Sequence, residues 1–298
     1  MRSLSQNTGW DSNHIIAMLV EDISDPFFSA VARIIEEDAH RRGYRIFYSS
    51  TGNDGAIAND LIKAYRDIRV DAYIMAPPPG VDDAVRALME EQIPVIFFDR
   101  FIPGLAGTRV VVDNGNGSLL AIQHLLGNGY QRIGFVTLDS GQTQMADRLG
   151  GYTGCTKKFG LPDLILRIPF GTAPARATRE IQLFLEDQAP DAVVFATHYL
   201  AVSGLRAITN LGLAIPDDIA VIGFDDSAFF TLCSPAITAV AQPIRSIAQT
   251  VLQHLIPCLC GEVQSPPEQT IVLPVSLVIR QSTVRGRNVN NQNQILPK

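Results

Sequence analysis

The sequence has few cysteines, no long apolar run and no excess of positive charge, and each of these absences excludes a class of protein. Its 298 residues include only four cysteines, which fit reduced thiols rather than a disulfide-rich secreted scaffold. No apolar run approaches the ~20 residues that a membrane-spanning helix needs. The formal net charge of −6 argues against a chain that coats nucleic acid by electrostatic attraction.

Signals for export, metal binding and catalysis are also missing. Arg2 is followed by no apolar segment of the kind that a secretory signal requires, so a cytoplasmic protein is expected. Cys258 and Cys260 have no second cysteine or histidine pair to complete a zinc site, and we interpret them as part of a helix end. The chain contains no nucleophile elbow, no phosphate loop with lysine and no recognisable Ser-His-Asp grouping. We therefore expect a protein that is not an enzyme and that has no cofactor and no metal.

The stretch from Met18 to Phe28 contains the first clear structural signal. Residues 15–20 form a short apolar run, as in a strand buried on both faces of a parallel sheet. Ser24 or Asp25 can cap the helix that follows, with Pro26 at its first position. Ligands of open α/β sheets bind at the carboxyl edge of the strands, so this turn is a candidate binding region. Asp25 and Phe27 are its candidate contacts, although Phe27 can equally belong to the core, as Phe28 should.

The rest of the chain alternates strand-like and helical patterns, which predicts an α/β fold of two doubly wound parallel-sheet lobes. The strand-like or extended runs are residues 15–20, 44–48, 72–76, 95–98, 110–112, 133–136, 164–168, 192–196, 219–224, 238–242 and 270–279, the last with Pro274 as a break. We expect an N-terminal lobe of residues 14–112 plus 243–270 and a C-terminal lobe of residues 113–242 plus 271–283. Residues 1–13 would be a linker and residues 284–298 a disordered tail. Lobes joined by several crossings would hinge and close around a ligand.

A series of short motifs gives the chain a family resemblance from about residue 2 to residue 283. The motifs are ISDPFF at 23–28, IPV at 93–95, FDR at 98–100, VDN at 112–114, HLLGNGY at 124–130, Arg148 before GY at 151–152, LGLAIPDD at 211–218, VIGFDD at 221–226, AVAQP at 239–243 and LPVSLVIRQS at 273–282. In this order and at this spacing, they resemble the lactose repressor/galactose repressor family of bacterial transcription regulators. The resemblance implies a periplasmic-binding-protein-like fold.

The resemblance also implies partners. Family members bind operator DNA through a helix-turn-helix headpiece and a hinge helix, form homodimers and respond to a small effector. Arg2-Ser-Leu4 looks like the middle of that hinge helix, with Leu4 at the position that enters the DNA minor groove, so the chain looks like a regulator core without its headpiece. The effector would be sugar-like or nucleoside-like. The alternative is a solute receptor that delivers a sugar to a transporter, because periplasmic receptors share these lobes.

Three effector-binding positions follow from the family pattern. Asp99 matches a ligand-binding carboxylate, Arg148 matches an arginine that reaches the ligand, and Asp225 matches the first acid of the family's Gly-Phe-Asp-Asp motif. Arg100 is a further candidate, although Asp99 and Arg100 can instead form a mutual surface ion pair, which would contribute little. Because neighbouring residues at a strand end point to opposite sides, Asp225 should face the cleft and Asp226 should cap a helix.

Phe170 and Gln242 are weaker candidates, each equally suited to a structural role. The chain departs from the family at His198 and Tyr199, where Asn and Asp are usual. In the family, the Asn normally binds the ligand and the Asp caps the following helix, so the chain should lose the cap carboxylate at Tyr199. His198 keeps a hydrogen-bonding edge but can titrate near neutral pH. We interpret the change as an altered class of ligand, and sequence drift is the alternative.

Overall fold

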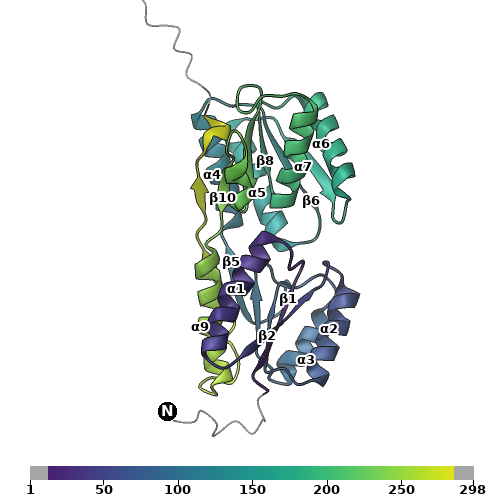
Figure 1. Cartoon of the computed structure of the whole chain (residues 1–298), viewed down its shortest axis with the longest axis vertical. Helices are drawn as coiled ribbons and strands as arrows, with labels where there is room; N and C mark the ends of the chain where they lie inside the picture. Colours follow the sequence, from purple (N-terminus) through teal and green to yellow (C-terminus); the bar gives the residue numbers. More distant parts are fainter. Residues whose placement is uncertain (1–12, 285–298) are drawn as a thin grey trace, which may run out of the picture. The chain divides into compact units, whose positions relative to one another are not determined.

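A computed structural model of the chain describes residues 13–284 and divides it into two compact units (Figure 1). Of the described residues, unit 1 comprises 13–114, 141–147 and 242–275, and unit 2 comprises 115–140, 148–241 and 276–284. The proposed hinge residue Leu4 and residues 285–298 of the tail expected at 284–298 lie outside the described residues. Asn13 is described, and its side-chain amide donates to the backbone oxygens of Ile68 and Arg69 in unit 1.

Unit 1 is built on a six-stranded sheet in which every strand pair is parallel. Its strands, in sheet order, are β11 (Gln269–Leu273), β5 (Thr108–Val112), β4 (Val95–Phe98), β3 (Ala72–Met75), β1 (Ile15–Val20) and β2 (Arg45–Ser50). Strands β3 and β4 are buried along their whole length, because helices cover both faces of the sheet. This burial explains why these strands are apolar throughout rather than alternating.

Within residues 13–284, four helices lie wholly in unit 1: α1 (Pro26–Arg41), α2 (Gly55–Asp67), α3 (Asp82–Glu90) and α9 (Ile244–Leu259). In Figure 1, α1 and α9 lie together on one side of the sheet and α2 and α3 on the other. The expected start of α1 is confirmed, since the Asp25 side chain caps it, accepting from the Phe27 N–H, and Pro26 comes first. Phe27 and Phe28 are both buried. The expected helix end at Cys258 is also confirmed, because α9 ends one residue later.

Unit 2 contains the second six-stranded sheet, which is parallel except at one edge. Its strands, in sheet order, are β12 (Ser276–Val278), β10 (Thr238–Ala241), β9 (Ala220–Phe224), β8 (Ala192–Phe195), β6 (Ile133–Asp139) and β7 (Leu164–Pro169). Its helices are α4 (Asn114–Gly127), most of α5 (Thr143–Phe159), α6 (Pro174–Gln188), α7 (His198–Asn210) and the short α8 (Ala228–Leu232). Among residues 13–284, no helix is long and apolar enough to cross a membrane.

The prediction that residues 271–283 belong entirely to the second lobe is wrong. Residues 269–273 form β11, which pairs in parallel with β5 in the sheet of unit 1. After α9 and β11, the chain returns to unit 2 only at Ser276 and then forms β12, antiparallel to β10. The two short strands lie on either side of Pro274, whose lack of an N–H suits a break between them. One strand-like stretch in the sequence therefore supplies an edge strand to each sheet.

Candidate effector-binding site

Asp99 stands directly after β4, at the carboxyl edge of the sheet of unit 1. Its backbone is left-handed, with φ of +66°, and its N–H donates to the Val110 oxygen on the neighbouring strand at 3.1 Å. Aspartate tolerates this conformation better than most residues. The backbone turns away from the sheet here, so the side chain stands at the strand end. Asp99 is 9 % exposed.

Arg100 is only 2 % exposed, and its Nη1 donates to the Glu21 carboxylate at 2.8 Å. Glu21 directly follows β1, so the two charges come from the ends of two strands of one sheet. The alternative prediction, a surface ion pair between Asp99 and Arg100, is wrong. Both residues are buried. A buried guanidinium needs a partner to offset its lost hydration, and Glu21 supplies one.

Two glutamines complete the cluster in unit 1. The Gln142 amide donates to the Glu21 carboxylate at 2.7 Å, and the Gln144 amide donates to the Asp99 carboxylate at 3.3 Å. Both glutamines are buried, where the first turn of α5 begins. Sequence reasoning missed these two and Glu21. For Glu21, the available signal was a polar residue directly after a buried strand, the same signal that identified Asp99.

Arg148 lies further along α5, in unit 2, and is also 2 % exposed. Its Nη1 donates to the Ala196 oxygen at 2.6 Å, and its guanidinium carbon lies 3.9 Å from the centre of the Phe224 ring. This cation–π contact stabilises a charge that would be costly to bury alone. A Cβ at Gly151 would collide with the Gly115 backbone of α4, so glycine there lets α5 approach closely. The structure thus gives Arg148 a fixed, buried position rather than a solvent-facing one.

Asp225 and His198 meet at the ends of the adjacent strands β9 and β8. Asp225 has the same φ of +66° and donates its N–H to the Val240 oxygen at 3.0 Å. Burial lowers the pKa of the His198 imidazole below its ordinary value, and the negative charge of Asp225 partly offsets this by raising it. His198 also lies 6.1 Å from the Phe230 ring, centre to centre. Unit 2 therefore brings Arg148, His198 and Asp225 to one edge of its sheet.

The helix cap that the chain should lose at Tyr199 is supplied by another residue. Thr197 is the N-cap of α7, and its hydroxyl oxygen accepts from the Leu200 N–H. Tyr199 is 37 % exposed. The start of α7 is therefore capped even though Tyr199 departs from the family pattern.

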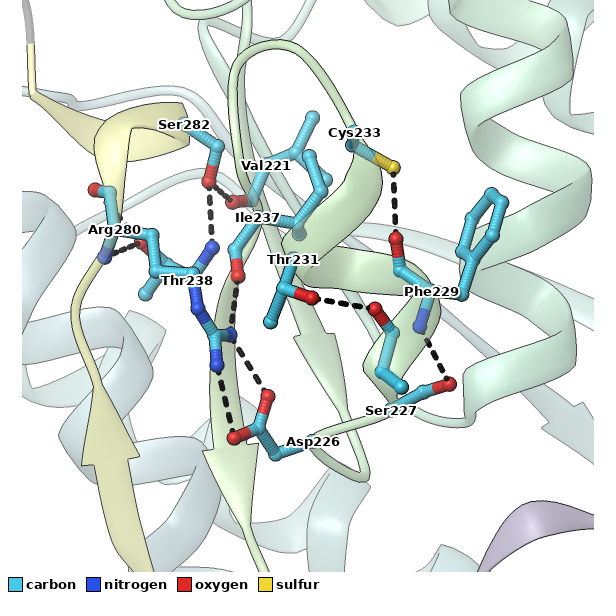
Figure 2. Close-up of polar contacts among 11 residues, drawn as sticks. Val221, Asp226, Ser227, Phe229, Thr231, Cys233, Ile237, Thr238, Arg280 and Ser282 are labelled. Atoms are coloured by element: carbon cyan, nitrogen blue, oxygen red, sulfur yellow. Dashed lines mark hydrogen bonds and ion pairs between the residues drawn. The ribbon is translucent and has the colours of Figure 1, made fainter.

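The prediction that Asp226 caps a helix is wrong. Figure 2 shows Asp226 paired with Arg280, whose two terminal nitrogens contact the two carboxylate oxygens at 2.7 and 3.0 Å. The same arginine donates to the Ile237 oxygen at 2.7 Å. Ser227 caps α8 instead. Because Arg280 comes from the segment after β12, the ion pair fastens that segment to the end of β9.

The other four candidates are Asp25, Phe27, Phe170 and Gln242. Asp25 caps α1, and Phe27 is buried with its ring against that of Phe28. Phe170 is half-buried in the turn after β7, and Gln242 is half-buried between β10 and α9. Their roles in ligand binding stay predictions.

Comparison with known proteins identifies the family to which the chain belongs. A profile of the periplasmic binding protein-like domain matches residues 122–283. The regulator DegA of Bacillus subtilis is 30 % identical over 282 residues, covering 93 % of this chain and 82 % of DegA. The chain belongs to the lactose repressor/galactose repressor family of transcription regulators. The predicted family and two-lobed fold are confirmed.

Two further members of the family illustrate its range. The repressor CytR of Escherichia coli K12 is 26 % identical, over 94 % of this chain and 82 % of CytR. A LacI family regulator from Enterococcus faecium, solved with bound ribose, is 26 % identical with a TM-score of 0.80, covering 91 % of this chain and 98 % of that one. These family members are transcription regulators rather than enzymes.

Proposed function

We propose that this chain is the effector-sensing part of a transcription repressor and that its effector is a small polyhydroxylated molecule, sugar-like or nucleoside-like. The observation that carries the proposal is a strand-end aspartate in each unit. Asp99 of unit 1 is followed by the buried Arg100, and Asp225 of unit 2 follows Phe224, whose ring contacts the buried Arg148. Carboxylates accept hydrogen bonds from hydroxyl groups, and guanidinium groups donate to them. In each unit, polar groups of this kind at the carboxyl edge of an α/β sheet suit a hydroxyl-rich ligand.

Each unit supplies its own part of this chemistry. In unit 1 the binding groups would be Asp99 and Arg100. In unit 2 they would be Arg148, His198 and Asp225, with the Phe224 and Phe230 rings supporting the first two. Asp25, Phe27, Phe170 and Gln242 complete the proposed set, and none of these residues would catalyse a reaction. Ribose bound to the Enterococcus faecium regulator supports a sugar-like ligand for this chain.

We further propose a cytoplasmic homodimer that acts on operator DNA in a form carrying a helix-turn-helix headpiece. A two-fold protein matches a palindromic operator. Unit 2 exposes large apolar side chains that a second copy would bury: Phe229 and Leu232 of α8, 42 % and 83 % exposed, and Ile279 after β12, 57 % exposed. The hydrogen bonds and ion pair of Figure 2 hold this part of the surface in place. The solute-receptor alternative is disfavoured, because DegA and CytR are regulators.

The direct test is a thermal-stability screen of the 298-residue chain against sugars, polyols and nucleosides. A ligand at a concentration 100 times its Kd should add about 2.7 kcal/mol to the free energy of unfolding. We expect at least one hydroxyl-rich compound to do so, with the gain reduced in an Asp225→Asn variant. Stabilisation only by compounds without hydroxyl groups would contradict the proposed function.

A further inference from the structure

The cluster in unit 1 contains buried polar atoms that the protein does not pair. Among the described residues, Nε and Nη2 of Arg100 and Oε1 of Gln144 are buried without a hydrogen-bond partner. Arg100 and Gln144 are 2 % and 5 % exposed. Buried polar groups are nearly always paired, and leaving one unpaired costs free energy. These three atoms therefore need hydrogen-bond partners from another molecule.

The orientation of the Gln144 amide follows from its neighbour. Its Nε2 lies 3.3 Å from Oδ2 of Asp99, and an ionised carboxylate can only accept. The nitrogen must face Asp99, so the unpaired oxygen of the amide is an acceptor. In Arg100, Glu21 occupies Nη1 and leaves Nε–H and Nη2–H, which lie side by side on one edge of the planar guanidinium. The cluster thus offers a two-pronged donor and a carbonyl acceptor.

We propose that Gln144 is an effector contact and that, with Arg100, it binds two neighbouring hydroxyl groups of an uncharged effector. This inference rests on the proposed function and specifies the class of ligand. A hydroxyl group both accepts and donates. Each of the two hydroxyl oxygens accepts one N–H of Arg100, and one of the hydroxyl protons goes to Gln144 Oε1. A vicinal diol therefore pairs all three unpaired atoms at once.

A ligand carboxylate does not fit the same cluster. It would satisfy the Arg100 fork, but it has no proton for Gln144 Oε1, which would stay unpaired. It would also place a negative charge beside the carboxylates of Glu21 and Asp99. Like charges held close together in a buried site repel strongly. The inference therefore excludes sugar acids that place their carboxylate here.

The test uses matched pairs of probes on the 298-residue chain: glucose and glucuronate, galactose and galacturonate, ribose and ribonate. Affinity is measured by calorimetry for the unchanged protein and for three variants. Gln144→Met removes the acceptor at similar side-chain volume. Arg100→Lys keeps the positive charge beside Glu21 but loses the fork. Gln249→Met, on the exposed surface of α9 in the same unit, is the matched control.

We expect a neutral sugar to bind at least tenfold more tightly than its acid. Gln144→Met should weaken that sugar about tenfold, and Arg100→Lys about tenfold to a hundredfold, whereas Gln249→Met should leave it unchanged. Tighter binding of the acids, or an unchanged affinity in Gln144→Met, would overturn this inference while leaving the proposed function standing. Binding by neither the neutral sugars nor the acids would count against both.

Discussion

Asp99 and Asp225 occupy the same place in the two sheets, each directly after the third strand from one edge and each with φ of +66°. Each donates its backbone N–H to the next strand of its sheet, to Val110 and Val240 respectively. The two units therefore repeat one local device, in which a left-handed residue ends a buried strand and carries a carboxylate. This repetition supports a shared role in binding, since the conformation costs most residues free energy.

The first prediction separates the carboxylate of Asp225 from its backbone conformation. Asp225→Asn should keep the left-handed backbone, which asparagine also tolerates, and leave the unfolding free energy nearly unchanged. Asp225→Ala should cost about 1–2 kcal/mol more, because alanine is strained at positive φ. Urea denaturation measures this difference. Both variants should lose about 1.5–3 kcal/mol of effector-binding free energy, as expected for a hydrogen bond to a charged group. Equal stability of the two variants would contradict the role of the backbone.

The second prediction concerns the cap of α7. Thr197→Ala should lower the unfolding free energy by about 1 kcal/mol, because the Leu200 N–H loses its acceptor. Thr197→Ser keeps a hydroxyl oxygen and should retain most of the stability. Thermal unfolding of the two variants side by side measures the effect. Similar losses in both would indicate that packing of the threonine methyl group, rather than capping, stabilises this helix start.

The third prediction concerns the proposed dimer. Leu232→Asp in α8 should shift the chain from dimer to monomer in sedimentation at micromolar concentration, since a buried charge would oppose association. Leu183→Asp is the matched control: Leu183 is 52 % exposed in α6, on a different helix of the same unit, and its replacement should leave the dimer intact. A monomeric unchanged protein, or a dimer that tolerates Leu232→Asp, would contradict this assignment of the surface.

The central strands were predictable because their burial on both faces leaves a continuous apolar run, as at residues 95–98. The edge strands were harder, since β11 is short and partly exposed and nothing local says which sheet it joins. Asp99 and Asp225 were accessible through family resemblance and their place after a strand. The hydrogen bond between Gln142 and Glu21 could not be predicted from the sequence, because it joins residues 121 positions apart and depends on the folded path of α5.

The last prediction concerns the pH dependence that His198 introduces. Burial lowers the pKa of its imidazole from the usual value of 6.5. Below about pH 6.5 the unfolded chain binds a proton at this residue more readily than the folded chain does, so stability should fall as the pH drops. His198→Asn removes this contribution. The loss of unfolding free energy between about pH 7.5 and pH 5.5 should therefore be smaller in the variant. Part of the loss that the variant still shows is due to His124, because burial lowers its pKa as well.

The same histidine offers a check through its neighbour. The charge of Asp225 raises the pKa of His198, so Asp225→Asn should lower that pKa further, as followed by NMR titration of the imidazole. If the neutral ring accepts an effector hydroxyl, protonation converts its acceptor nitrogen into a donor and binding should weaken as the pH falls below that pKa. Effector affinity should then lose this pH dependence in His198→Asn, whose side-chain oxygen accepts at every pH. An identical pH profile in the two proteins would mean that His198 does not contact the effector, and the exchange of Asn for His would then be sequence drift.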